Sequence, residues 1–130
     1  ERRKKGFFLL LMFVIFSYWG YHLFQVKPSA ISGKIISADR LLYLSLHELH
    51  LKDYKESERL CEMVIAREPA NADAHYQLAA SQFLLDDPQA AKKTWAKAKS
   101  LAPASENADR LRKLVVKQKN LPSEDIPALK

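Results

Sequence analysis

The residues after position 37 repeat with a period of 34, and this spacing limits the fold more than any other feature. The identical pairs are Ala38/Ala72, Asp39/Asp73, Leu44/Leu78, Leu51/Leu85, Asp53/Asp87, Pro69/Pro103 and Ala70/Ala104. A period of about 20–50 residues is typical of proteins that stack small structural units into an array. The sequence therefore predicts two stacked units, residues 38–71 and 72–105.

Each unit contains two amphipathic segments of helical length. We predict helices at about 38–51, 54–67, 72–85 and 88–101. Pro69 and Pro103 end the two units because proline cannot continue a helix, whereas Pro88 suits a first helical turn, where its missing N–H costs nothing. Small residues allow the two helices of a unit to approach closely, and these are Ser45, Ser57, Ala79 and Ala91.

The positions of these residues resemble the pattern of the tetratricopeptide repeat family over residues 38–105. The second unit carries Leu78, Ala79, Ala91, Trp95, Ala98 and Pro103 at pattern positions. The first unit matches more loosely, with Leu41, Leu44, Ser45, Ser57, Cys61, Val64 and Pro69. Glu48 and Gln82 depart from the pattern, which has an aromatic residue there. The resemblance implies an all-α fold built as a solenoid of antiparallel helix pairs.

Residues 106–121 are predicted to form a C-terminal capping helix, followed by a flexible tail over 122–130. Ser105 is a suitable N-cap, and cations fill the last turns, where they favour the helix dipole. One mostly apolar stripe contains Ala108, Leu111, Leu114, Val115 and Gln118. Repeat arrays generally need about three units to bury a continuous core. We therefore expect further stabilising contacts from the cap, the tail, a membrane surface or a partner.

An uncharged stretch, residues 7–26, precedes the repeats. About 20 residues rising ~1.5 Å each span roughly 30 Å, the thickness of a bilayer core. The sequence therefore predicts one N-terminal transmembrane helix, with a linker at 27–37. Basic residues in the flank 1–6 and aromatic residues near the other end are typical of such an anchor. They are Arg2, Arg3, Lys4, Lys5, Tyr18, Trp19 and Tyr21.

The basic flank also predicts the orientation of this anchor, since positive charge stays on the cytoplasmic side. We expect a single-pass protein of the inner (cytoplasmic) membrane, with a cytoplasmic N-terminus and a periplasmic repeat domain. His22 falls within the stretch. Its imidazole could bind a haem or chlorophyll, or simply reach water beside the interfacial aromatic residues.

The remaining charges and histidines favour no catalytic or metal chemistry. The net charge of +6 belongs largely to the N-terminal flank, because residues 38–121 hold 14 basic and 12 acidic side chains, so no nucleic-acid binding is expected. His47 and His50 share a helical face, but His75 is distant in sequence, and a metal site needs three or four converging ligands. Cys61 lies on an apolar face, which favours the role of a buried small residue. We expect no enzyme, no cofactor and no metal.

The resemblance implies that the first helix of each unit lines a concave groove for a partner. The corresponding residues are Asp39, Leu42, Leu46, Leu49, His50, Asp73, Tyr76, Ala80, Phe83 and Leu84. Such a surface is mainly apolar with an acidic rim, which favours an amphipathic helix or a hydrophobic segment. Leu42 and Tyr76 replace the polar residues with which some family members bind a C-terminal carboxylate.

Two functions follow from these expectations. The first is a membrane-tethered protein-interaction adaptor in an envelope process such as cytochrome c maturation, secretion or pilus assembly. Its partners would be an amphipathic segment of an exported protein, or subunits of a membrane complex, together with membrane lipid. The alternative is a structural accessory subunit of a large respiratory or photosynthetic complex, held by its transmembrane helix.

Overall fold

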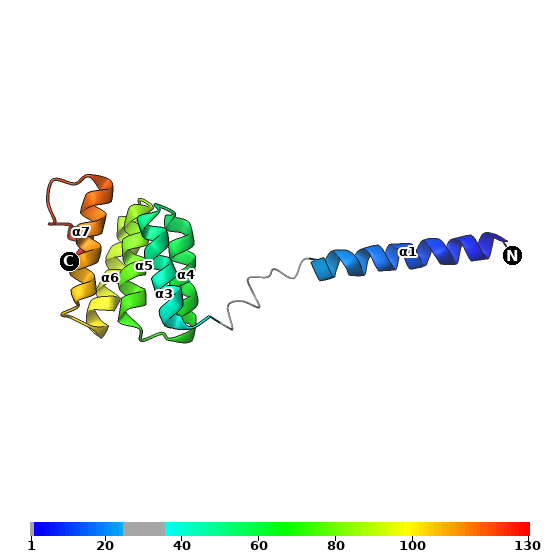
Figure 1. The fold of residues 1–130 in the computed structure, drawn as a ribbon, viewed down its shortest axis with the longest axis horizontal. Coiled ribbons are helices and arrows are strands. Elements are labelled where there is room, and N and C mark those ends of the chain that lie inside the picture. Colours follow the sequence, from blue (N-terminus) through cyan, green and yellow to red (C-terminus); the bar gives the residue numbers. More distant parts are fainter. Residues whose placement is uncertain (1, 25–35) are drawn as a thin grey trace. The chain divides into compact units, whose positions relative to one another are not determined.

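The computed structural model describes residues 2–24 and 36–130 and divides the chain into two compact units, Glu1–Ile35 and Ile36–Lys130. Both units are drawn in Figure 1. Throughout the described ranges the regular structure is helical. The helices are α1 (Arg2–Phe24), α3 (Ala38–His50), α4 (Tyr54–Arg67), α5 (Ala72–Leu84), α6 (Pro88–Leu101), α7 (Glu106–Lys119) and the short 3₁₀ helix η1 (Pro127–Leu129).

Helix α1 corrects the prediction of a membrane anchor. Of the helices within residues 2–24 and 36–130, none has the length and apolar character needed to cross a membrane. The physical reason lies in the composition of α1, which begins with four basic residues and is strongly apolar only from Phe7 to Phe16. About ten residues rising ~1.5 Å each cover roughly half of a bilayer core.

The transmembrane helix and the single-pass inner-membrane location with a periplasmic domain were therefore wrong predictions. Tyr18, Trp19 and Tyr21, expected at a membrane interface, are exposed residues of α1. The side chain of His22 and most of the expected linker fall outside the described residues.

Side-chain caps explain why α3, α4, α5 and α6 begin where they do, whereas Ser105 before α7 makes no such cap hydrogen bond. Ser37 Oγ accepts a hydrogen bond from the Arg40 N–H at 3.3 Å, and Asn71 Oδ1 accepts one from the Ala74 N–H at 3.1 Å. Asp53 and Asp87 cap α4 and α6 in the same way. Such caps satisfy N–H groups that lack partners within the helix. The helix bounds match the four predicted helices to within one residue.

The turns that end α3, α5 and α7 share an unusual backbone conformation. Lys52 and Asp86 both have φ of 64°, and Asn120 has φ of 53°. The three residues stand 34 positions apart, as do the residues that precede α3, α5 and α7, which are Ser37, Asn71 and Ser105. The repeat therefore extends beyond residue 105, and α7 occupies the place of the first helix of a third unit.

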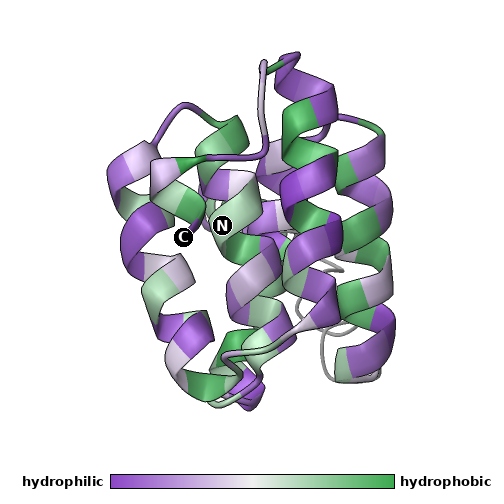
Figure 2. Ribbon diagram, turned by 90° about the vertical axis from the view of Figure 1, so that its left-hand side faces the viewer, coloured by the Kyte–Doolittle hydropathy of each residue, from purple (hydrophilic) through white to green (hydrophobic). Residues whose placement is uncertain are grey.

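Neighbouring helices pack against each other along the chain. α3 packs on α4, α5 on α4 and α6, and α7 on α5. In Figure 2, hydrophobic and hydrophilic residues alternate along these helices, as in amphipathic helices, and α5 is buried over most of its length. Trp95 of α6 and Tyr76 of α5 form the aromatic centre of the core, with ring centroids 4.7 Å apart at an interplanar angle of 75°.

The segment after α7 packs against the core rather than forming the predicted flexible tail. Ile126 is 4% exposed and Leu129 is fully buried. Arg112 Nε donates a hydrogen bond to the Leu129 carbonyl at 2.8 Å, which holds η1 close to α7. η1 also packs on α6. The two apolar side chains thus belong to the same core cluster as Trp95 of α6 and Leu111 of α7.

One side chain of α7 connects the third unit to the first. Gln118 Nε2 donates to the Leu49 carbonyl at the end of α3, at 2.7 Å. Its Oε1 accepts from the Tyr54 hydroxyl at the start of α4, at 2.6 Å. Lys119 pairs with Asp86, so the last turn of α7 also contacts the turn after α5.

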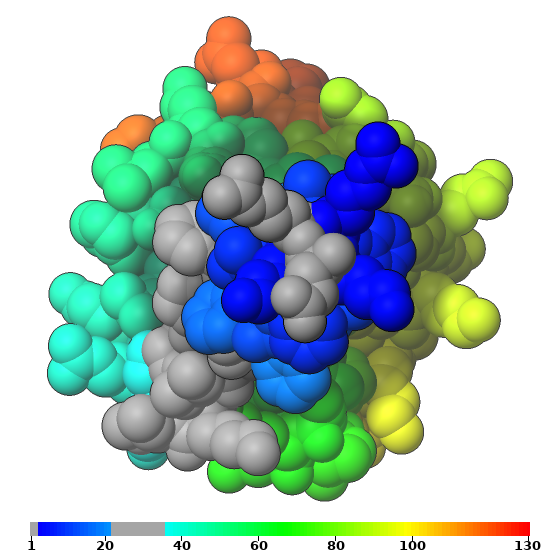
Figure 3. All heavy atoms as spheres, turned by 90° about the vertical axis from the view of Figure 1, so that its right-hand side faces the viewer, coloured from blue at the N-terminus to red at the C-terminus, as the bar shows by residue number. Residues whose placement is uncertain are grey.

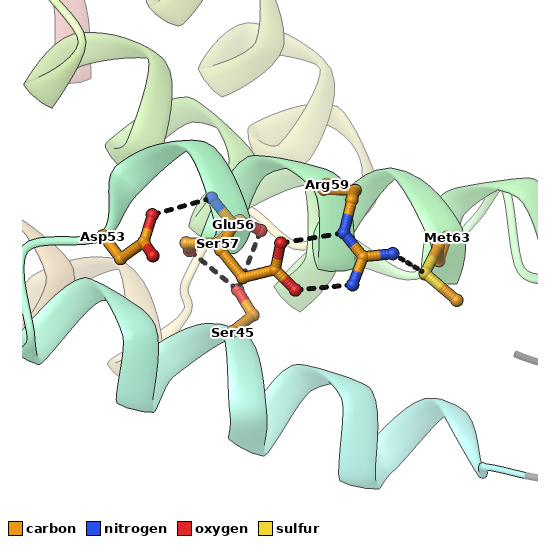
Figure 4. A network of polar contacts seen from close by, with 6 residues as sticks. All are labelled: Ser45, Asp53, Glu56, Ser57, Arg59 and Met63. Carbon is orange, nitrogen blue, oxygen red and sulfur yellow. Dashed lines mark hydrogen bonds and ion pairs between the residues drawn. The ribbon is translucent and has the colours of Figure 1, made fainter. Parts of the chain in front are cut away.

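Polar contacts fill the crossing of α3, α4 and α5, where small residues let the helices approach. Ser57 Oγ lies 3.0 Å from Ser45 Oγ and 2.9 Å from Ser81 Oγ, and all three serines are fully buried. Figure 4 shows Ser45 facing Ser57, and on the outer side of α4 the pair of Glu56 with Arg59. Hydrogen bonding by Arg59 holds the pKa of Glu56 below its usual value.

Gln77 gives a first testable prediction. Its side chain is buried, and Oε1 has no hydrogen-bond partner. Leu111, at the equivalent position of the third unit, is buried in the core. Replacing Gln77 by leucine removes an unsatisfied buried acceptor and is expected to raise the free energy of unfolding by about 1 kcal/mol. Urea denaturation of the full chain measures this, with exposed Gln89→Leu as the matched control.

Candidate functional site

The ten residues expected to line a partner groove do not form one open surface. Four are buried in the core of the domain, namely Leu49, Tyr76, Ala80 and Leu84. Three are exposed, namely Asp39, His50 and Asp73, and three are half-buried, namely Leu42, Leu46 and Phe83. The groove predicted from the sequence is therefore largely filled by the domain itself.

The α5 part of this surface is occupied by neighbouring elements. The Tyr76 hydroxyl donates to the Ala102 carbonyl at 2.5 Å, and burial raises the pKa of this side chain. Lys119 Nζ of α7 lies 4.9 Å from the centre of the Phe83 ring. Asp73 accepts a hydrogen bond from Asn107 of α7 at 3.3 Å. These contacts assign the α5 residues to packing against α6 and α7.

The α3 part of the surface remains accessible. Leu42 and Leu46 are half-buried and lie one turn apart, and Asp39 and His50 extend this face toward the two ends of the helix. Tyr43, next to Leu42, is 71% exposed. Sequence reasoning missed Tyr43 because the family pattern does not place it in the groove. Comparison of the repeats could have identified Tyr43. The equivalent residues of the second and third repeats, Gln77 and Leu111, are buried, whereas the large aromatic ring of Tyr43 is exposed.

Two of the histidines, His50 and His75, and the cysteine Cys61 are held in structural contacts. His75 Nε2 donates to the Pro69 carbonyl at 2.8 Å, and His50 Nδ1 lies 2.8 Å from the Leu46 carbonyl. Within residues 2–24 and 36–130, no group of three His, Cys, Asp or Glu residues could hold a metal ion. Burial raises the pKa of Cys61 to about 12, so its thiol stays protonated and lacks the thiolate that a nucleophile requires.

A second surface feature lies over α4, α5 and α6. It is a hollow of about 500 Å³. The lining residues are Glu62, Ile65 and Ala66 of α4, His75 and Leu78 of α5, and Lys93, Thr94 and Lys97 of α6. No motif in the sequence marks this hollow, because its residues come from three helices. The one sequence signal is the histidine at 75, in the repeat position where the first unit has the buried Leu41.

The helix that forms one wall of the hollow is strongly basic. α6 carries Lys92, Lys93, Lys97 and Lys99 and has no acidic residue. Salt bridges in the described parts of the chain involve none of these four. Figure 3 shows side chains of the yellow-green part of the chain, which includes α6, projecting from the surface. Lys99 donates a hydrogen bond to the main-chain oxygen of Lys130 at 2.7 Å, so Lys92, Lys93 and Lys97 are the α6 lysines whose ammonium groups have no polar partner in the described residues.

Comparison with known proteins adds no relative. The chain matches no family model, no curated protein and no solved structure. The resemblance to tetratricopeptide repeats therefore depends on the residues and the geometry of this chain.

Proposed function

We propose that residues 36–130 form a protein-interaction module of the tetratricopeptide type, which binds a segment of another protein. The observation that carries this proposal is the backbone repeat. Helix starts and left-handed turns recur with the period of the sequence repeat through α3, α5 and α7. Stacks of this kind present extended surfaces on which partner segments bind.

The face of α3 is the binding surface that we assign to this module. Leu42, Tyr43 and Leu46 supply apolar contact area, and Asp39 supplies an acidic edge. Aromatic residues with accessible rings are enriched at protein interfaces. The partner is an amphipathic segment that places apolar side chains against Leu42 and Leu46 and a polar side toward water.

A photo-crosslinking amino acid at Leu42 tests this function. In cells that express the full chain, we expect a crosslinked product of discrete mass, and we expect the Tyr43→Asp change to remove it. The same crosslinker at Lys113, an exposed position on α7, serves as the matched control. Equal yields from both positions, or a product that persists with Tyr43→Asp, would contradict the proposal.

A second candidate function is favoured by α1. Its residues Phe7, Phe8, Phe13 and Phe16 are each at least two-thirds exposed, and between Phe7 and Phe16 the helix is apolar on all sides. A helix that is apolar all round is normally enclosed by other elements. The protein would then be a permanent subunit of a larger assembly, with α1 enclosed by other polypeptides. Co-purification in fixed stoichiometry that is lost when Phe13 and Phe16 become serine would support this function.

A further inference from the structure

We propose that the hollow over α4, α5 and α6 is a second docking site, which takes an apolar side chain from an acidic amphipathic helix of a partner protein. This inference deepens the proposed function and rests on it. It concerns a different surface from the face of α3, because all of the lining residues belong to α4, α5 and α6.

The interior of the hollow suits an apolar side chain. Ile65 and Leu78 contribute aliphatic surface, and Ala66 leaves room beside them. Two polar side chains of the lining, Thr94 and His75, already have hydrogen-bond partners within the domain. Thr94 Oγ1 donates to Gln82 Oε1 at 2.7 Å, and His75 Nε2 donates to the Pro69 carbonyl. A side chain such as leucine or phenylalanine can therefore enter without removing a hydrogen-bond partner from either group.

The rim determines the charge of the occupant. Lys93 and Lys97 are exposed and lie one helical turn apart on α6. Glu62 is the only acidic residue of the lining, and it forms none of the ion pairs of the described residues. Two cations face one anion, so the rim attracts carboxylates. Acidic residues spaced by one turn on a partner helix match the spacing of Lys93 and Lys97.

The shape of the site favours a helix over an extended chain. Its two walls come from α4 and α6, the second helices of successive units. A partner helix that lies along these walls can place one apolar side chain between them, in the manner of helices bound in grooves. Acidic side chains one turn before and after that residue then approach the lysines.

The test uses the full chain and a short, fluorescently labelled peptide that spans a few helical turns. The peptide is an amphipathic helix with leucine on one face and glutamates one turn apart beside it, and a second version replaces each glutamate by lysine. Fluorescence anisotropy measures binding. We expect the acidic peptide to bind and the basic version not to bind. Affinity should fall as salt is added, because exposed charge pairs are screened.

Matched variants locate the binding. Lys93→Glu with Lys97→Glu should weaken binding of the acidic peptide at least tenfold. Lys92→Glu with Lys113→Glu makes the same change in charge at exposed positions outside the hollow and should change affinity less than twofold. Ala66→Trp fills the hollow without a change in charge and should also weaken binding tenfold. Circular dichroism melts confirm that each variant is folded.

Several results would overturn the inference. These are equal loss with both charge pairs, no loss with Ala66→Trp, or no binding of the acidic peptide at millimolar concentration. Tight binding of oleate that Ala66→Trp abolishes, without peptide binding, would assign the hollow to a fatty acid instead. Crosslinking at Leu42 tests the face of α3 alone. The peptide experiments can therefore contradict a docking site in the hollow while the proposed interaction module is still supported by crosslinking.

Discussion

Replacing Leu129 by alanine is expected to lower the free energy of unfolding by about 2–5 kcal/mol. The side chain is fully buried and belongs to the same core cluster as Trp95, Leu111 and Ile126. Removing it leaves a cavity between η1 and the helices and also weakens the position of the carbonyl that Arg112 contacts. Urea denaturation of the full chain, followed by circular dichroism, gives the change.

The matched control is Glu124→Ala, in the same segment but exposed. Exposed substitutions of this kind usually change stability by less than about 0.5 kcal/mol. If Leu129→Ala and Glu124→Ala have equal effects, the segment after α7 contributes nothing to the core, and its packing against α6 is contradicted.

Alkaline conditions should destabilise the domain through Cys61. Burial raises the pKa of this thiol in the folded chain to about 12, from an ordinary value of 9.0. Between these values the unfolded chain loses the thiol proton while the folded chain keeps it, so the unfolded state binds fewer protons. The free energy of unfolding therefore falls as pH rises above about 9, by up to about 1.4 kcal/mol per pH unit.

Urea titrations of the full chain at pH 8, 9, 10 and 10.5 measure this slope. Other groups also titrate in this range, so the prediction concerns the difference from Cys61→Ala. That variant keeps a small side chain at the crossing of α3 and α4 but has no thiol to ionise. Parallel slopes for the two proteins would show that the thiol does not govern the alkaline response.

Helices α3 to α6 could be predicted from sequence because their boundaries are set locally. Asp53, Asp87 and Asn71 each cap a helix within three residues, and Pro88 occupies a first turn. The third unit was harder to recognise because α7 has few residues identical to α3 and α5. The available signal was Asn120, one full repeat after Asp86, since asparagine adopts the left-handed conformation more readily than most residues.

The groove could not be predicted in the same way, because its fate depends on tertiary packing. A periodic pattern identifies which residues share a face, but it does not identify what covers that face. Here the α5 residues Tyr76, Ala80 and Leu84 join the core, whereas Leu42 and Leu46 on α3 stay partly accessible. The hollow was equally hidden, because its residues are adjacent only after α4, α5 and α6 have packed.

The expectation for the N-terminal segment failed for a different physical reason. Residues 7–26 carry no acidic or basic charge apart from His22, but absence of charge is not the same as strong hydrophobicity. Ser17, Tyr18, Gly20 and Tyr21 contribute little to the free energy of transfer into hydrocarbon. The apolar length of α1 is therefore much shorter than its uncharged length.

The two hydrogen bonds of Gln118 have a consequence for how the domain loses its structure. In a linear array each unit contacts only its neighbours, so the end units can fray one at a time. Gln118 joins α7 to Leu49 and Tyr54, two units away in the stack. Unfolding of α3 and α4 therefore breaks hydrogen bonds to α7, in the third repeat, as well as their packing on α5, in the second repeat. This coupling between the ends favours a single cooperative transition over stepwise unzipping.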